Sequence, residues 1–283
     1  MVRGAEIIMP ELISEMPPTN LYLIRHGQAI VNVEPIIGGM KGDCGLTELG
    51  IEQATLLYER LRQSDEIRPD ILIASTLPRA RQTAEIIAPA FPGVPLRFDD
   101  DVQELRCGDE GDGLTIDAYK KRFGWVSFDD EPLRPVDPHG ESWGTFVLRV
   151  SLALTRITKE SAGKSIVVVC HGGVIDASFL HFFGMNGLAF PPAGFATQNT
   201  SLTHWEYTLY HGKLRWRLVG YNDAAHLKTL NRPRAVEGID YAETIRKSEL
   251  PVKPIEEVLP AQEDSQKENS PVLEEVQGSF ALE

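Results

Sequence analysis

Four side chains suited to phosphate chemistry follow three short apolar runs in this sequence. They are Arg25, His26, Arg79 and His171. The runs, at 21–24, 71–75 and 165–170, have the length and composition of buried strands. Because parallel strands end at one edge of a sheet, where α/β proteins bind their ligands, we expect the four side chains to converge on one pocket.

The chemistry of these side chains is that of an anion site with a nucleophile. Guanidinium groups grip a tetrahedral oxyanion through paired hydrogen bonds, and an imidazole either donates a hydrogen bond or attacks. Gly27 lets the backbone turn sharply beside His26. Taken singly, Arg79 fits a helix-surface arginine and His171 a buried structural histidine. Only the combination favours phosphate chemistry.

The composition narrows the class of protein. The 283-residue chain is 42% hydrophobic and 24% charged, which is ordinary for a globular protein. Its net charge of −13 argues against a nucleic-acid partner but leaves room for a local basic pocket. No apolar run approaches the roughly 20 residues of a membrane span, and the N-terminus lacks the apolar core of a signal peptide. We therefore expect no membrane partner.

The cysteines indicate neither a disulfide framework nor a zinc site. Cys44, Cys107 and Cys170 are widely spaced and form no CxxC pair, which is typical of a protein in the reducing cytoplasm. Together with His26 and His171 they match no familiar zinc spacing, and two arginines in the pocket would repel a cation. The sequence predicts no metal and no cofactor.

The order of elements predicts an α/β fold with a mostly parallel sheet, helices on both faces and a C-terminal hairpin. The expected strands are 21–24, 71–75, 94–98 and 165–170, with hairpin strands at 200–208 and 213–221. The expected helices are 48–62 (capped by Thr47), 79–88, 115–123, 141–160 and 174–183. Residues 99–140 are irregular and acidic, and we expect a small lid insertion over a site.

Three regions follow from this order. Residues 1–19 are expected to be a leader without structure of its own, and residues 20–231 to form the domain. From 232 to 283 there are twelve acidic residues against six Lys and Arg, with few aromatic residues. Such a composition is typical of a disordered tail.

The ordered motifs resemble those of the histidine phosphatase superfamily, in its phosphoglycerate mutase-like branch. The matching segments run in the family's order over about residues 20–225. They are LIRHGQ with Asn32, GLTELG, STLPRARQTA, QEL at 103–105, HGES at 139–142, VVVCHGGV and NTSL. RHG alone is a weak signal, whereas the ordered set is specific.

The resemblance implies a metal-independent phosphomonoester hydrolase that acts through a phosphohistidine. His26 would be the nucleophile. Arg25, Asn32, Arg79 and His171 would hold the phosphate oxygens during transfer.

A general acid is also required, because an alkoxide leaves poorly without a proton. Glu104, in the QEL step, occupies the family's acid position. Glu110 in GDEGDG is the rival, although this loop lacks the tryptophan that many relatives carry. Glu141 in HGES is expected to organise the loop or to cap the next helix.

Two other functions stay open at this point. A phosphomutase would return the phosphoryl group to substrate, but the chain has QELRCG where phosphoglycerate mutases carry an Asn-Glu-Arg-His-Tyr-Gly-like run. A non-catalytic relative would only bind a phosphorylated ligand, although all the expected pocket residues are present. The expected partner is a small phosphorylated metabolite, and the sequence leaves its identity and a homodimeric state open.

Overall fold

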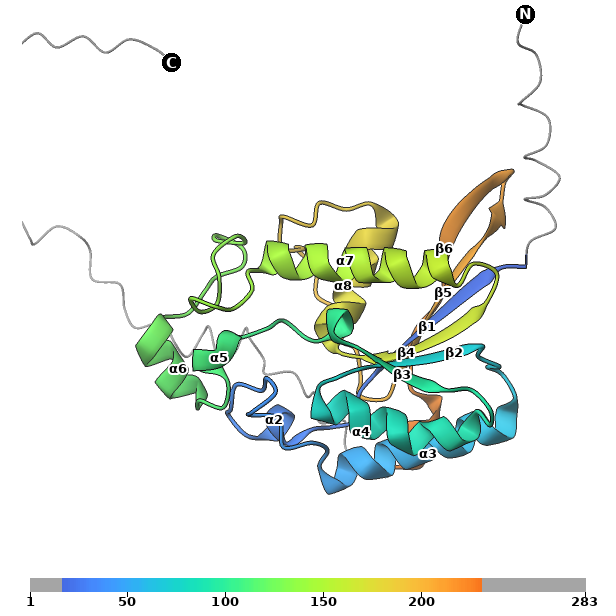
Figure 1. Cartoon of the computed structure of the whole chain (residues 1–283), viewed down its shortest axis with the longest axis horizontal. Helices are drawn as coiled ribbons and strands as arrows, with labels where there is room; N and C mark the ends of the chain where they lie inside the picture. Colours follow the sequence, from blue (N-terminus) through green and yellow to red (C-terminus); the bar gives the residue numbers. More distant parts are fainter. Residues whose placement is uncertain (1–16, 231–283) are drawn as a thin grey trace, which may run out of the picture. The chain divides into compact units, whose positions relative to one another are not determined.

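The computed structural model of the chain describes residues 17–230, which contain a six-stranded sheet (Figure 1). The strands lie in the order β3-β2-β4-β1-β5-β6. Their bounds are β1 Thr19–Arg25, β2 Ile71–Ser75, β3 Leu96–Asp99, β4 Ser165–Cys170, β5 Leu202–Tyr210 and β6 Lys213–Asp223. The first four run parallel, whereas β5 and β6 form an antiparallel hairpin at one edge.

The central strand β4 explains why its sequence is uniformly apolar. It pairs with β1 on one side and with β2 on the other. Val168 packs into the core on one face of the sheet, and Val167 and Val169 pack into the core on the other. A strand buried on both faces reads as a continuous hydrophobic run, as in a parallel sheet with two helical layers.

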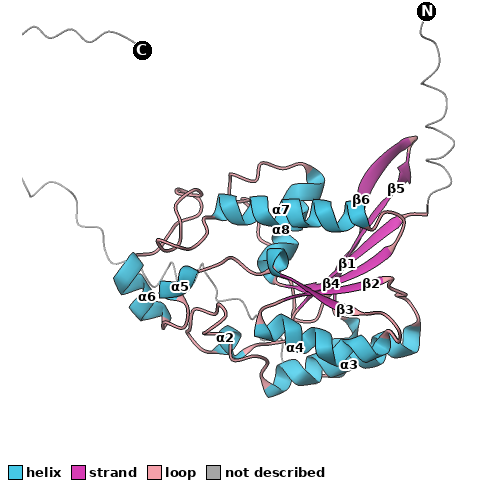
Figure 2. Cartoon of the chain, in the orientation of Figure 1, coloured by secondary structure: helices cyan, strands magenta, loops and turns pink. Residues whose placement is uncertain are grey.

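Two helical layers cover the sheet (Figure 2). Helices α3 (Glu48–Ser64) and α4 (Pro78–Ile87) pack on one face, where Leu57 and Ala80 join the core. Helices α7 (Trp143–Glu160) and α8 (Gly172–Phe183) pack on the other, through Phe146 and Ile175 among others. The predicted α/β fold with helices on both faces is confirmed.

The predicted insertion lies at the carboxyl ends of the parallel strands, beside the loop that follows β1 (Figure 1). It carries α5 (Gly108–Gly111) and α6 (Ile116–Phe123), and the loop carries α2 (Ile30–Val33). Asp112 joins the two segments, because its carboxylate accepts hydrogen bonds from the backbone nitrogens of Gly39, Lys41 and Gly42 at 2.7–2.9 Å. The insertion is therefore attached to the loop that borders the strand ends.

The starts of α7 and α8 differ from the sequence expectation, whereas that of α3 does not. The helix expected from 141 begins at Trp143, because Ser142 accepts a hydrogen bond from Thr145 N and forms a capping box with it. The helix expected from 174 begins at Gly172, with His171 at its N-cap position. Thr47 caps α3 as predicted, by accepting from Gly50 N at 3.0 Å.

Other differences concern short elements and strand ends. The third strand covers 96–99 instead of 94–98, since Pro95 has no N–H for a ladder. Helices α2 and α5 span four residues each, too few to show a helical repeat in the sequence. The same holds for the 3₁₀ turns η1 (Ala88–Ala90), η2 (Asp100–Val102) and η3 (Ala225–Thr229).

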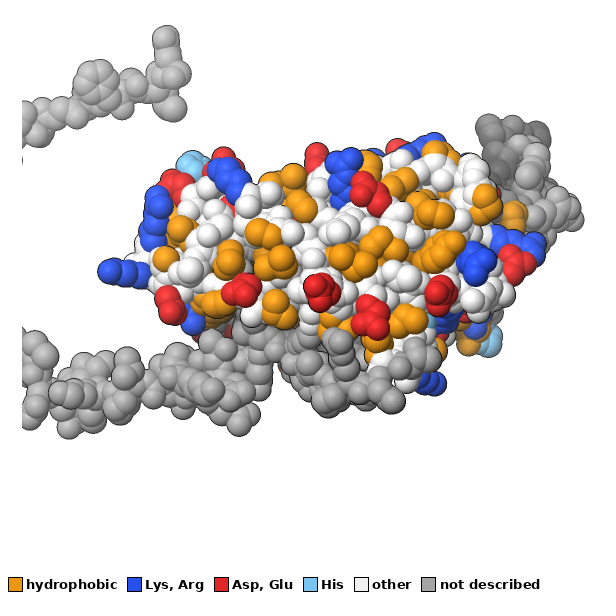
Figure 3. All heavy atoms as spheres, turned by 90° about the horizontal axis from the view of Figure 1, so that it is seen from below, with side chains coloured by type: hydrophobic (Ala, Val, Ile, Leu, Met, Phe, Trp, Pro, Cys, Tyr) orange, Lys and Arg blue, Asp and Glu red, His pale blue; other side chains and the backbone are white. Residues whose placement is uncertain are grey.

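The molecular surface on the side of α3 and α4 has the composition of a surface exposed to water. Acidic and basic side chains are interspersed there with apolar ones (Figure 3). Among residues 17–230, no helix combines the length and apolar character needed to cross a membrane. The predictions for the tail at 232–283 and for most of the leader lie outside the described residues.

Candidate active site

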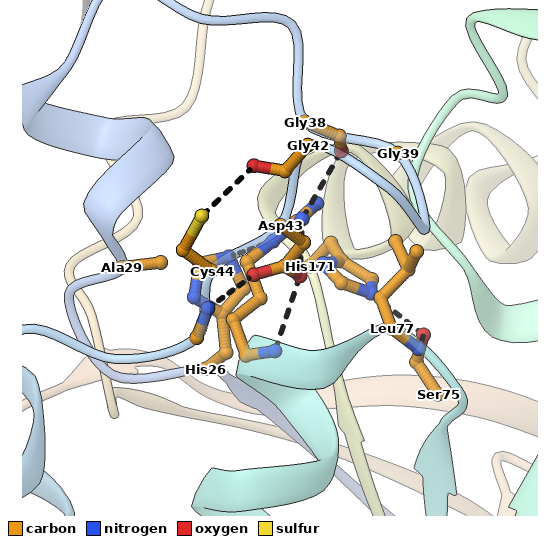
Figure 4. A network of polar contacts seen from close by, with 12 residues as sticks. His26, Ala29, Gly38, Gly39, Gly42, Asp43, Cys44, Ser75, Leu77 and His171 are labelled. Atoms are coloured by element: carbon orange, nitrogen blue, oxygen red, sulfur yellow. Dashed lines mark hydrogen bonds and ion pairs between the residues drawn. The ribbon is translucent and has the colours of Figure 1, made fainter. Parts of the chain in front are cut away.

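Adjacent strands bring the predicted site residues together. Strands β1, β4 and β2 are neighbours and end at the same edge of the sheet. The rings of His26, just after β1, and His171, just after β4, have centroids 5.2 Å apart. Arg79, the second residue of α4, places its Nε 3.2 Å from His26 Nε2. Figure 4 shows both histidines beside the loop of Gly38 to Cys44.

The contacts of His26 define which ring nitrogen carries the proton. Nδ1 lies 2.7 Å from the carbonyl oxygen of Gly27. A carbonyl can only accept, so Nδ1 must donate. Nε2 accepts the hydrogen bond from Arg79 Nε–H, since a guanidinium can only donate. The Nε2 atom therefore presents a lone pair toward the arginine.

Burial and charge keep both imidazoles neutral. The pKa of His26 is lowered well below 6.5, first by burial and then by the positive charges of Arg79 and Arg25. The pKa of His171 is also lowered well below 6.5, by burial and then by Arg79. A neutral imidazole has the lone pair that a nucleophile needs.

Asp43 fixes Arg79, and sequence reasoning missed it. Its Oδ2 forms a buried ion pair with Arg79 Nη1 at 2.8 Å and also accepts from Arg79 N at 3.1 Å. Arg79 Nη1 donates further to the carbonyl of Gly38 at 3.2 Å. The guanidinium is thus oriented from the loop after β1, in a GDCG turn that carries no recognisable signal in one sequence.

Ser75 orients the second histidine and was also missed. It is the last residue of β2, and its Oγ lies 2.8 Å from His171 Nε2. The other nitrogen, His171 Nδ1, is buried and has no hydrogen-bond partner within residues 17–230. This leaves Nδ1 available for a ligand oxygen. The two residues are 96 positions apart, so nothing in the sequence indicates that they are in contact.

Arg25 and Asn32 lie at the rim of the cluster. Arg25 Nη1 donates to the carbonyl of Thr197, while its charge acts on both histidines. Asn32 Oδ1 accepts from Ala29 N at 2.9 Å. Within the described part of the chain, no hydrogen bond joins Asn32 to the histidines or to Arg79, so its observed contact is that of a local cap.

Glu104 lies at the amino end of α8. Its Oε2 accepts from Gly173 N at 3.1 Å and its Oε1 from Leu105 N at 3.0 Å. A helix N-terminus is a favourable place for a carboxyl group. Glu110, by contrast, lies on α5 and forms an exposed ion pair with Arg122 at the surface of the insertion.

A partly buried ion pair holds the segment that carries Glu104. Arg149 on α7 binds Glu141 bidentately, at 2.6 and 2.7 Å. The same guanidinium donates to the backbone carbonyls of Asp101, Gln103 and Glu104 at 2.9–3.1 Å. Of the two roles expected for Glu141, it therefore has that of organising the loop. The other role, that of the helix cap, belongs to Ser142.

The cluster is closed in this structure. His26, Arg79 and His171 are each less than 5% exposed. A hollow of about 510 Å³ borders Asp43 and α4, and neither histidine lines it. Within residues 17–230, no three His, Cys, Asp or Glu side chains are grouped to hold a metal ion.

The family model described as "Histidine phosphatase superfamily (branch 1)" matches residues 21–224. The chain belongs to this superfamily. A probable phosphatase of Schizosaccharomyces pombe is 30% identical over 215 residues, which cover 74% of this chain and 95% of the relative. A metal-independent phosphoserine phosphatase of Arabidopsis thaliana is 31% identical over 178 residues, 59% of this chain and 69% of the relative. Proteins named as probable phosphoglycerate mutases are also among the relatives.

A solved structure shows a similar fold. It is a mutant phosphoserine phosphatase of Entamoeba histolytica in complex with phosphoserine. The TM-score is 0.57 and the identity 27%, over 74% of this chain and 99% of that one. The resemblance to this superfamily predicted from the motifs is confirmed.

The neutral state of His171 predicts a pH dependence of stability. The unfolded chain protonates this histidine below pH 6.5, whereas the folded chain resists protonation, so stability falls as the pH drops below 6.5. Between about pH 6.5 and about pH 5.5, this histidine should lower the free energy of unfolding by roughly 1 kcal/mol. His171→Gln lacks this contribution.

Chemical denaturation of wild type and His171→Gln at several pH values measures the effect. The difference in the free energy of unfolding between wild type and variant at about pH 8 measures the contacts that the variant has lost. The change in this difference toward about pH 5.5 measures the titration of His171. A difference that is the same at both pH values would show that His171 titrates in the folded chain as it does in the unfolded one, which contradicts the lowered pKa.

Proposed function

We propose that this protein is a phosphomonoester hydrolase in which His26 accepts the phosphoryl group. The observation that carries the proposal is the state of His26. Its Nδ1 proton is bound by the Gly27 carbonyl, and its Nε2 lone pair lies beside a buried guanidinium. A neutral imidazole held against positive charge is the arrangement that attack on a phosphate dianion requires.

Hydrogen-bond donors for the phosphate oxygens surround His26. A bound phosphate offers Arg79 Nε–H a stronger, charged acceptor than the imidazole, so substrate frees the Nε2 lone pair for attack. His171 Nδ1 and the Arg25 guanidinium lie close enough to stabilise the charge that spreads over the phosphoryl oxygens. Asn32 can join this set through its Nδ2 donor, because the contact with Ala29 N uses only Oδ1.

The reaction then has two steps. Nε2 forms a bond to phosphorus as the ester oxygen leaves, and Glu104 gives that oxygen a proton. Water next attacks the phosphohistidine while the Glu104 carboxylate takes one of its protons, which restores both the acid and the neutral imidazole. Neither step calls for a metal ion, because arginines and histidines supply the positive charge and the hydrogen-bond donors.

The substrate class is a small phosphorylated metabolite. Phosphoserine is the first compound to test, because one solved relative is in complex with it. The three cysteines are free in the structure, which supports a working place in the reducing cytoplasm. A mutase remains the second candidate, since some relatives are named so. The absence of the mutase-like run around Glu104 favours hydrolysis.

Removal of His26 tests the proposal. The measurement is phosphate release, in EDTA, from a panel of phosphoserine, phosphoglycerates, sugar phosphates, nucleotides and phosphopeptides. His26→Ala should lose at least ~10³-fold in rate, or about 4 kcal/mol, and His139→Ala, an exposed histidine, should match wild type. An alanine variant within tenfold of wild type contradicts the proposal. Interconverted phosphoglycerates without phosphate release would favour the mutase.

A second prediction concerns the acid. Glu104→Gln should slow hydrolysis of an alkyl phosphate by roughly 10²–10⁴-fold but slow p-nitrophenyl phosphate much less, because that leaving group departs as an anion. Glu110→Gln is the matched control, since it removes the same kind of group from the insertion surface. The quantity to compare is the ratio of alkyl to aryl turnover. If it collapses only in the Glu110 variant, the assignment is wrong.

A further inference from the structure

Gly173 makes room for the carboxyl group of Glu104 on the surface of α8. A Cβ atom built on Gly173 would lie 2.3 Å from Glu104 Oε1. The Glu104 carboxylate therefore occupies the place where a side chain at position 173 would begin. Its hydrogen bond from Gly173 N holds it there.

A second carboxyl group, that of Asp176, follows three residues later on the same helix. Residues three apart in a helix are neighbours, with Cβ atoms about 5–6 Å apart. Because Glu104 takes the place of a side chain at 173, its carboxyl group lies on the side of α8 that carries Asp176, and its charge acts on Asp176. Asp176 Oδ1 is buried and, within residues 17–230, has no hydrogen-bond partner.

The groups around Asp176 come from three other segments. Glu104 faces it from the loop after η2, Arg25 from the end of β1, and Tyr221 from β6. Burial and then the Glu104 charge raise the pKa of Asp176 to about 7, and Arg25 partly opposes this rise. Two facing carboxyl groups cannot both be ionised at little cost, as in other enzymes with paired acids.

We propose that Asp176 and Glu104 share one proton at the amino end of α8, so that the pair supplies the general acid of the reaction. This inference rests on the proposed role of Glu104. Backbone N–H groups at a helix start stabilise a carboxylate, whereas a general acid must hold a proton when substrate binds. Asp176 supplies the compensating negative charge, and so acts as a positioning residue for the proton.

The proton balance of the cycle is simple. The pair starts with one proton and two carboxyl groups. The leaving oxygen takes that proton from Glu104, and two carboxylates remain. The water that attacks the phosphohistidine returns a proton to Glu104, and the pair again holds one.

Infrared spectroscopy tests the shared proton without using activity. In wild type, the carbonyl stretch of a protonated carboxylic acid should persist up to near neutral pH and titrate there. Asp176→Asn should abolish this band near neutral pH, and Glu104→Gln should move its midpoint to lower pH. Glu52→Gln, which removes an exposed carboxyl from α3, should leave it unchanged. A titration midpoint that is the same in Glu104→Gln and wild type would overturn the proposal. Glu104→Gln therefore tests the shared proton even if Asp176→Asn does not fold.

The pH dependence of turnover gives the kinetic readout. For an alkyl phosphate, Asp176→Asn should shift the falling alkaline limb to lower pH by roughly one unit, because the acid loses its proton earlier. A limb that stays in place contradicts a shared proton. If Glu104→Gln leaves the alkyl-to-aryl ratio unchanged while the infrared titration behaves as expected, the proposed role of Glu104 fails and the shared proton stands.

Discussion

The hydrogen bond from His26 Nδ1 to the carbonyl of Gly27 is the interaction on which the rest of the site depends. It fixes the proton on one ring nitrogen and turns the other toward Arg79. Burial next to two guanidiniums keeps the ring neutral. If the proton moved from Nδ1 to Nε2, an N–H group would face the arginine and the lone pair would be lost. Most other contacts of the site serve to hold this arrangement.

The fold provides the arrangement because three parallel strands end side by side. The backbone turn after β1 is close-packed: a Cβ on Gly27 would approach the carbonyl oxygen of Gly50 to 2.6 Å. Helix α3 therefore lies directly against the turn that carries His26. Asp43 and Ser75 then orient the two partners of His26, one from the loop after β1 and one from β2. Each group of the cluster is therefore oriented from a different segment.

The sequence predicted the groups that follow apolar runs, and it missed the groups that support them. Arg79 and His171 could be placed because strand ends are visible as short hydrophobic stretches next to unusual polar residues. Asp43, Ser75 and Arg149 could not, because their partners are brought together only by the tertiary fold. Glu141 was expected to organise its loop or to cap a helix, and the ion pair with Arg149 decides in favour of the loop. The predicted start of α8 was two residues late, because Gly172 and Gly173 already belong to the helix that follows His171.

The measurement that tests this account most directly is the location of the phosphoryl group during turnover. Labelled phosphomonoester is mixed with the enzyme, the reaction is quenched in alkali, and the labelled peptide is mapped, with the ring position assigned by NMR. The account predicts a single label, on Nε2 of His26, because Nδ1 is occupied by its proton and the Gly27 carbonyl. A label on His171, or on Nδ1 of His26, would contradict it.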